Sequence, residues 1–150
     1  MLYLGIDQHA RQITVSLRNE GGDVVLARQV STRPERINEF FQRLTRERLR
    51  EGESFVAVLE VCGFNAWLIR MLHDYRCEKV ILIQPEKRKK QKTDRRDAAT
   101  LSELLWVNRD RLVAGKPVRG LRQVDIASTA DQENRRLTTL RKETSQARTR

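Results

Sequence analysis

The sequence predicts an α/β fold in which helices cover a mixed five-stranded sheet and a helical extension follows at the C-terminal end. Three observations lead to this prediction. Three short segments up to residue 30 have the patterns of strands, and helical spacing then alternates with short apolar runs. Residues 123–150 contain neither proline nor glycine, which favours one long helix.

The first part of the chain predicts three strands joined by short turns. Residues 2–6 form an apolar run that ends at Asp7, as in a buried strand. Residues 12–18 alternate between apolar and polar, as in a half-buried strand. A turn with two glycines at 19–23 precedes a third strand at 24–30. Short turns between consecutive strands predict an antiparallel meander.

A helix is predicted to follow this meander. Thr32 suits its N-cap, Pro34 its first turn, and Glu35 the position three residues after the cap. Apolar residues then recur at helical spacing, and the helix is expected to end near Arg50, before Gly52.

The remaining elements alternate between strand and helix. The patterns predict a strand over 55–60, a helix over 66–75, a strand over 79–84, a loop in the basic run 87–92 and a helix over 97–107. The resulting order, β-β-β-α-β-α-β-loop-α, is that of a ribonuclease-H-like domain. We expect this domain to span 1–113, and residues 114–150 to form a linker and a charged helix that packs on a partner or on nucleic acid.

The net charge of +10 is concentrated in the second part of the chain. Residues 1–86 hold 12 Lys and Arg against 12 Asp and Glu, whereas residues 87–150 hold 18 against 8. This distribution predicts a nucleic-acid-binding face, although a solvated basic helix or a tail for any polyanion has the same composition. The residues expected to contact phosphates are Lys87, Arg88, Lys89, Lys90, Lys92, Arg95 and Arg96.

Four acids occupy related places in the predicted topology. Asp7 ends the first strand and Glu60 the fourth, while Asp94 and Asp97 begin the last helix of the domain. Neighbouring parallel strands would bring Asp7 and Glu60 to one sheet edge, and the spacing of Asp94 and Asp97 puts both on one helix face. Four adjacent carboxylates need a divalent cation such as Mg²⁺ or Mn²⁺. Alternatively, Asp7 could open a turn, Glu60 could cap the following helix, and Asp94 could be an N-cap with Asp97 as its first-turn partner.

Three segments resemble the N-terminal, RuvC-like domain of the DEDD transposases of bacterial insertion sequences, which are related to the pilin-gene invertases. They are Gly-Ile-Asp-Gln-His at 5–9, Leu-Glu-Val-Cys-Gly at 59–63 and Lys-Thr-Asp-Arg-Arg-Asp-Ala at 92–98. The resemblance covers about residues 1–110 and is most specific in the third segment. It implies that Asp7, Glu60, Asp94 and Asp97 are catalytic Mg²⁺ ligands. It also implies a recombinase that cuts and rejoins DNA, guided by a structured RNA.

Members of that family carry a second, C-terminal domain with a glycine-rich segment and a serine nucleophile. The sequence ends at Arg150 within a charged run, so we expect it to be the N-terminal part of a longer, oligomeric protein. On its own it could bind metal and nucleic acid yet lack full strand-transfer activity.

Other functions compete with this interpretation. A Holliday-junction resolvase would use the same fold and be complete in about this length. A nucleic-acid-binding module could use the acids only as caps. An actin-like ATPase also begins with Gly-Ile-Asp, but no glycine-rich phosphate loop follows Asp7 here.

Several features exclude other classes of protein. The cysteines and histidines are too few for a zinc site or a disulfide framework, and Cys62 and Cys77 are expected to be buried thiols. No apolar run approaches the roughly 18 residues of a membrane span, and no signal peptide is evident. We therefore expect a cytoplasmic, nucleoid-associated protein. Trp67 and Trp106 are expected in the core rather than stacked on bases.

Overall fold

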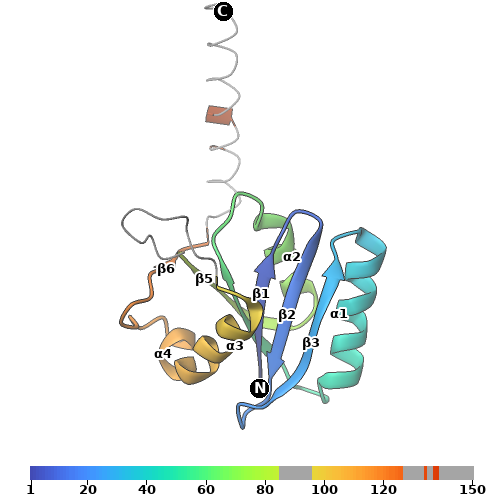
Figure 1. Ribbon diagram of the computed structural model, residues 1–150, viewed down its shortest axis with the longest axis horizontal. Helices are drawn as coiled ribbons and strands as arrows, with labels where there is room; N and C mark the ends of the chain where they lie inside the picture. Colours follow the sequence, from blue (N-terminus) through green and yellow to red (C-terminus); the bar gives the residue numbers. More distant parts are fainter. Residues whose placement is uncertain (85–95, 127–133, 135–136, 139–150) are drawn as a thin grey trace, which may run out of the picture.

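A computed structural model of the chain describes residues 1–84, 96–126, 134, 137 and 138. Its sheet has the strand order β3-β2-β1-β4-β5-β6 (Figure 1). β1 (Leu2–Gln8), β2 (Gln12–Arg18) and β3 (Val24–Ser31) form the predicted antiparallel meander. β4 (Phe55–Glu60) runs parallel to β1, and β5 (Cys77–Ile83) runs parallel to β4. The chain thus has the predicted α/β, ribonuclease-H-like fold.

The sheet has six strands rather than the five predicted. β6 (Gln123–Val124) pairs antiparallel with the end of β5, and the N–H of Gln84 donates to the Arg122 carbonyl over 2.8 Å. The prediction of a helix from residue 123 is therefore wrong at its start, because these residues satisfy backbone groups at the open edge of β5. Residues 134, 137 and 138 are helical, and the rest of that predicted helix, like the basic run 87–92, lies outside the described residues.

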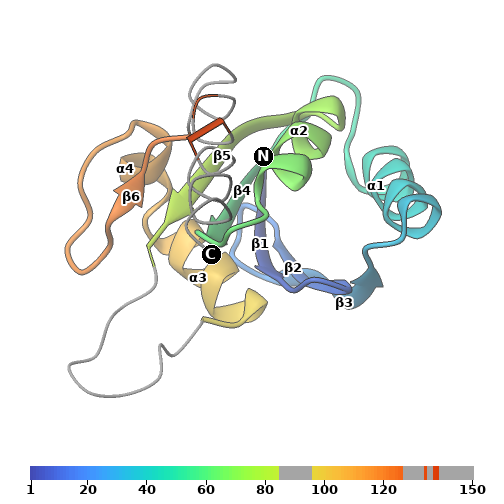
Figure 2. The ribbon, with the colours of Figure 1, turned by 90° about the horizontal axis from the view of Figure 1, so that it is seen from above.

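Helices cover both faces of the sheet (Figure 2). α1 (Pro34–Arg48) and α2 (Ala66–Asp74) pack on one face, while α3 (Ala98–Val107) and the short α4 (Arg109–Val113) pack on the other. β4 is buried on both sides, so consecutive residues belong to different cores: Leu59 to the core that includes Phe41 of α1, and Val58 to the core that includes Leu101 of α3. Among the described residues, no helix is both long enough and apolar enough to cross a membrane.

The start of α1 differs from the prediction. Its N-cap is Arg33, without a side-chain cap, because the predicted cap Thr32 is bound elsewhere. The Thr32 hydroxyl donates to the Ala10 carbonyl over 3.0 Å, and its N–H donates to the Arg11 carbonyl over 3.1 Å. These two bonds hold the start of α1 against the turn between β1 and β2.

Gly5 allows α3 to lie directly on β1. A Cβ atom at Gly5 would lie 2.3 Å from the Ala98 carbonyl oxygen and 2.4 Å from the Ser102 nitrogen, so only glycine fits. The Ser102 hydroxyl also hydrogen-bonds to that of Ser16 over 2.9 Å and accepts from Arg18 Nε over 3.1 Å. Close packing and buried hydrogen bonds together fix α3 over β1 and β2.

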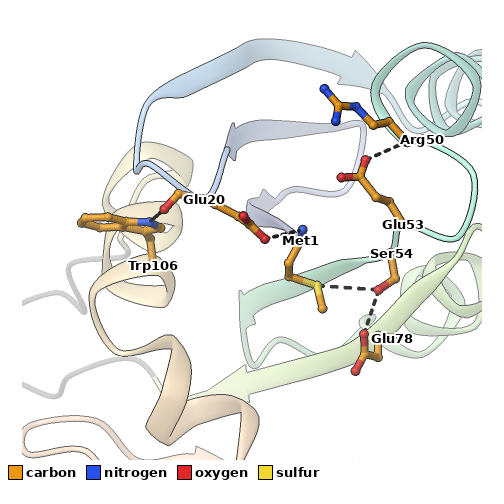
Figure 3. A network of polar contacts seen from close by, with 7 residues as sticks. All are labelled: Met1, Glu20, Arg50, Glu53, Ser54, Glu78 and Trp106. Atoms are coloured by element: carbon orange, nitrogen blue, oxygen red, sulfur yellow. Dashed lines mark hydrogen bonds and ion pairs between the residues drawn. The ribbon is translucent and has the colours of Figure 1, made fainter.

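Polar contacts hold together the sheet end at which β1 begins (Figure 3). The indole N–H of Trp106 donates to the Glu20 carbonyl, and the N-terminal ammonium pairs with the Glu20 carboxylate, each over 3.0 Å. Ser54, just before β4, donates to the Glu78 carboxylate over 2.7 Å. Trp67 and Trp106 both pack against the cores as predicted, each partly buried. The candidate acids lie at the opposite end.

Candidate metal centre

The strand register makes Asp7 and Glu60 lateral neighbours. Ile6 pairs with Leu59 across the parallel strands β1 and β4, so the next residue of each strand is a carboxylate. Side chains alternate along a strand, and Gly5 and Val58, two residues earlier, both face α3. Asp7 and Glu60 therefore share the α3 face, at the carboxyl end of their strands.

Glu60 is a buried carboxylate that is only partly compensated. Its side chain is 3% exposed, and its Oε1 accepts from Arg96 Nη1 over 3.2 Å and from the Arg96 N–H over 3.4 Å. The other oxygen, Oε2, is buried and has no hydrogen-bond partner within the described part of the chain. A buried carboxylate oxygen without a partner is costly, so Oε2 is the atom at this sheet edge that could accept a cation.

Asp7 and Asp97 each have a partner of their own. Asp7 Oδ2 lies 3.0 Å from His9 Nε2, and its side chain is 18% exposed. Asp97 is the N-cap of α3, and its Oδ1 accepts from the Thr100 N–H over 2.7 Å. That backbone hydrogen bond is the main cause that holds the pKa of Asp97 below its usual range. The alternative had Asp94 as the cap and Asp97 in the first turn; instead, Asp97 is itself the cap, and α3 begins after it at Ala98.

The described structure holds three of the four predicted acids. Asp97 directly precedes Ala98, whose carbonyl lies above Gly5, so the start of α3 lies over β1, the strand that carries Asp7. Asp94 lies outside the described residues. Among those that are described, no three His, Cys, Asp or Glu side chains gather closely enough to hold a metal ion. The four-carboxylate site therefore stays a prediction.

Of the basic residues predicted to contact phosphates, only Arg96 lies within the described residues. Six of the seven basic residues lie outside the described part of the chain: Lys87, Arg88, Lys89, Lys90, Lys92 and Arg95. The seventh, Arg96, points inward; its side chain is 14% exposed and paired with Glu60. Electrostatic compensation of a buried acid is thus the observed role of Arg96.

A second set of buried polar groups, which sequence reasoning missed, fixes the segment after Glu60. Gln8 is 2% and Asn65 6% exposed, and Asn65 Nδ2 donates to Gln8 Oε1 over 2.7 Å. Asn65 Oδ1 accepts from the Cys62 N–H over 2.6 Å, and Gln8 Nε2 donates to the Phe64 carbonyl over 3.0 Å. These bonds tie the ends of β1 and β4 together. The only sequence signal was a polar residue, Gln8, beside Asp7.

Comparison with known protein families gives a match. Residues 4–150 match the model of the IS110-type DEDD family, whose description is "Transposase". The match covers nearly the whole chain and includes all four candidate acids. No curated protein matches the chain.

Proposed function

Because this chain belongs to the family of IS110-type DEDD transposases, which are DNA-cleaving enzymes, we propose that Asp7, Glu60, Asp94 and Asp97 hold a divalent metal ion during cleavage. Mg²⁺ and Mn²⁺ are the expected ions, since both prefer the oxygen ligands that carboxylates supply. In this proposal the chain is the N-terminal catalytic domain of the transposase.

The observation that carries the proposal is the uncompensated oxygen of Glu60. Oε2 is buried, and no described group donates a hydrogen bond to it. Asp7 is the lateral neighbour of Glu60 on the same face of the sheet, which supplies a second carboxylate. A bound cation would neutralise both acids, and it would supply the electrostatic stabilisation that phosphoryl transfer requires.

The protein's own contribution is a rigid mounting for these acids. Asp7 and Glu60 lie at the carboxyl ends of the central strands β1 and β4, and the buried bond from Asn65 to Gln8, the last residue of β1, ties these ends together. Arg96 holds Glu60 through two donors, which fixes the carboxylate and balances its charge before any ion binds. Sites mounted on strands keep their geometry better than sites on loops.

Partners and the wider reaction are also part of the proposal. The basic segment after β5, which is the strand next to that of Glu60, would contact the phosphates of DNA or of a guide RNA. Residues 87–93 contain no acid. The contacts would come from Lys87, Arg88, Lys89, Lys90, Lys92 and Arg95. Rejoining of DNA is assigned to the full-length, oligomeric protein. Residues 1–113 would belong to its catalytic domain, together with β6, which completes the same sheet.

A plasmid-nicking assay tests the proposal. We expect this chain to nick supercoiled DNA with Mg²⁺ or Mn²⁺ and not with EDTA. Glu60→Gln should lower nicking by more than the roughly 10–100-fold that loss of an outer-shell partner costs. Glu51→Gln, which makes the same change at an exposed acid, should nick like the wild type.

Two results would contradict parts of the proposal. Equal nicking by the wild type and Glu60→Gln would remove Glu60 from the site. If a wild-type chain that binds Mn²⁺ does not nick DNA, cleavage must depend on protein outside this chain. A strong preference for four-way junctions over plasmid would instead favour the resolvase alternative.

A further inference from the structure

We propose that an arginine-lined groove along β3 and α1 binds the phosphate backbone of DNA. The groove lies in the half of the chain whose net charge is zero, so composition gave no sign of it. The inference uses the proposed cleavage site only to orient the DNA, and its test does not depend on metal.

The groove consists of two adjoining hollows. The first, of about 530 Å³, is lined by Arg11, Ser31, Thr32, Arg33 and Arg36, with no acid among them. The second, of about 310 Å³, shares Ser31 and Arg36 with the first and continues along the edge strand. Besides the shared residues, it is lined by two more arginines, Arg28 and Arg43, by one acid, Glu39, and by Gln29, Val30 and Phe40.

The arginines of the first hollow keep their charge available for an anion. Arg11 and Arg33 are exposed and form no ion pair within the described residues. Arg36 lies 3.7 Å from Glu39, but both side chains are more than half exposed, and such pairs contribute little. Guanidinium groups donate in pairs to phosphate oxygens, which makes arginine the preferred side chain for this ligand.

The fold holds these three arginines in one place. Arg11 belongs to the turn after β1, and its carbonyl accepts from the Thr32 N–H over 3.1 Å. Arg33, the N-cap of α1, donates its own N–H to Ser31 Oγ over 3.2 Å. Arg36 follows in the first turn of α1, which runs beside β3 (Figure 1). The turn after β1 and the start of α1, which are about 20 residues apart in the sequence, thus bring the three arginines to one corner of the fold.

The position of the groove connects it with the candidate metal centre. Asp7 pairs with Thr14, and Thr14 pairs with Gln29, so Gln29 of the groove lies two strands from Asp7 in direct register. Two strand spacings are about 10 Å. The acids face α3 and the groove lies beside α1 on the other side of the sheet, so one DNA strand would reach both by passing the sheet end that carries Arg11, with a phosphate about every 3.4 Å along the helix axis.

The occupant is a nucleic acid rather than a small anion, because the arginines extend along both hollows instead of closing round one point. DNA is favoured because the groove lies in register with the proposed DNA-cleaving acids. Phosphate contacts carry no sequence information, so the groove would position DNA without selecting its sequence.

The test measures binding of a labelled single-stranded DNA in EDTA by fluorescence anisotropy over a salt series. We compare the wild type with the triple variant Arg11→Gln, Arg33→Gln and Arg36→Gln. Loss of three phosphate contacts should reduce the slope of log K against log salt by about 2 and weaken binding roughly tenfold at low salt. A matched control, Arg46→Gln, Arg48→Gln and Arg50→Gln, removes the same charge from the other end of α1 and should change affinity less than about threefold.

Further variants keep the result interpretable. Replacing the same three arginines with lysine retains the charge and should retain the slope, with affinity several-fold weaker because the paired donors are lost. Equal weakening by the two glutamine triples would overturn the proposal. A loss confined to RNA of the same sequence would overturn DNA as the occupant. Since metal is absent, Glu60→Gln should bind like the wild type, so failure of the cleavage site and failure of the groove are distinguishable.

Discussion

Replacing Gly5 with alanine tests how closely α3 lies on β1, the contact that brings the start of α3 over the strand carrying Asp7. The new Cβ would lie 2.3 Å from the Ala98 carbonyl oxygen, and protein Cβ atoms essentially never approach closer than 3.0 Å. The difference requires α3 to withdraw by at least 0.7 Å. Because the obstructing atoms belong to backbone, no side chain can rotate away.

Overpacking of this kind costs about 1–3 kcal/mol, and we expect the upper end of that range. For a domain of this size, about 3 kcal/mol lowers Tm by roughly 6–12 °C. Thermal unfolding followed by circular dichroism measures the shift. Gly63→Ala is the matched control, because nothing lies within 4 Å of its added Cβ and its φ is ordinary, so its Tm should change little. Equal melting of Gly5→Ala and wild type would refute the close contact between α3 and β1.

Three further predictions follow from individual side chains. Arg96→Ala should lower the free energy of unfolding by about 3 kcal/mol, because it leaves the buried Glu60 carboxylate without its arginine. The double variant Arg96→Ala with Glu60→Gln should lose less stability. Urea unfolding measures both losses, and equal losses would contradict a stabilising Arg96–Glu60 ion pair. Asp97→Ala should cost about 1 kcal/mol at pH 7 through loss of its cap. Since the folded pKa of Asp97 is lowered, this contribution is complete above its unfolded pKa, near 3.9, and is lost as pH falls through the folded pKa. A difference in the free energy of unfolding that is the same at pH 7 and at pH 2 would contradict this. Burial raises the pKa of Cys77 to about 12, so at pH 8 only about one thiol in ten thousand is ionised. A thiol reagent should label the half-buried Cys62 first and Cys77 only on unfolding, and equal labelling rates in the native protein would contradict this burial.

Most of the fold could be predicted because its elements have strong local patterns. The limits of β4 match the predicted 55–60, because five consecutive apolar residues are followed by the charged Glu60 at the end of the strand. β6 could not be predicted, because two residues carry no period, and they pair with β5 only once its edge exists. The predicted N-cap of α1 was wrong for a similar reason. Thr32 has a suitable side chain, but its hydroxyl donates to the carbonyl of Ala10, in a turn about 20 residues earlier in the sequence.

The site could be predicted only as a set of strand ends. The positions of Asp7 and Glu60 follow from topology, and the register of β1 and β4 confirms that they are neighbours. What each carboxylate contacts depends on side-chain geometry that spacing does not encode. Arg96 was therefore expected among phosphate contacts, although it is paired with buried Glu60, and the arginine groove was hidden by a balanced local charge.

Calorimetric titration with Mn²⁺ tests the central claim, that Glu60 and its neighbouring acids bind a divalent metal ion. The wild type should bind Mn²⁺, Glu60→Gln should bind at least about 100-fold more weakly, and Glu51→Gln should bind like the wild type. Glu60→Gln removes the negative charge of the buried Glu60–Arg96 ion pair, which destabilises the fold. Folding of this variant is therefore checked by circular dichroism at the same temperature. Equal Mn²⁺ affinity in the wild type and a folded Glu60→Gln would contradict the account.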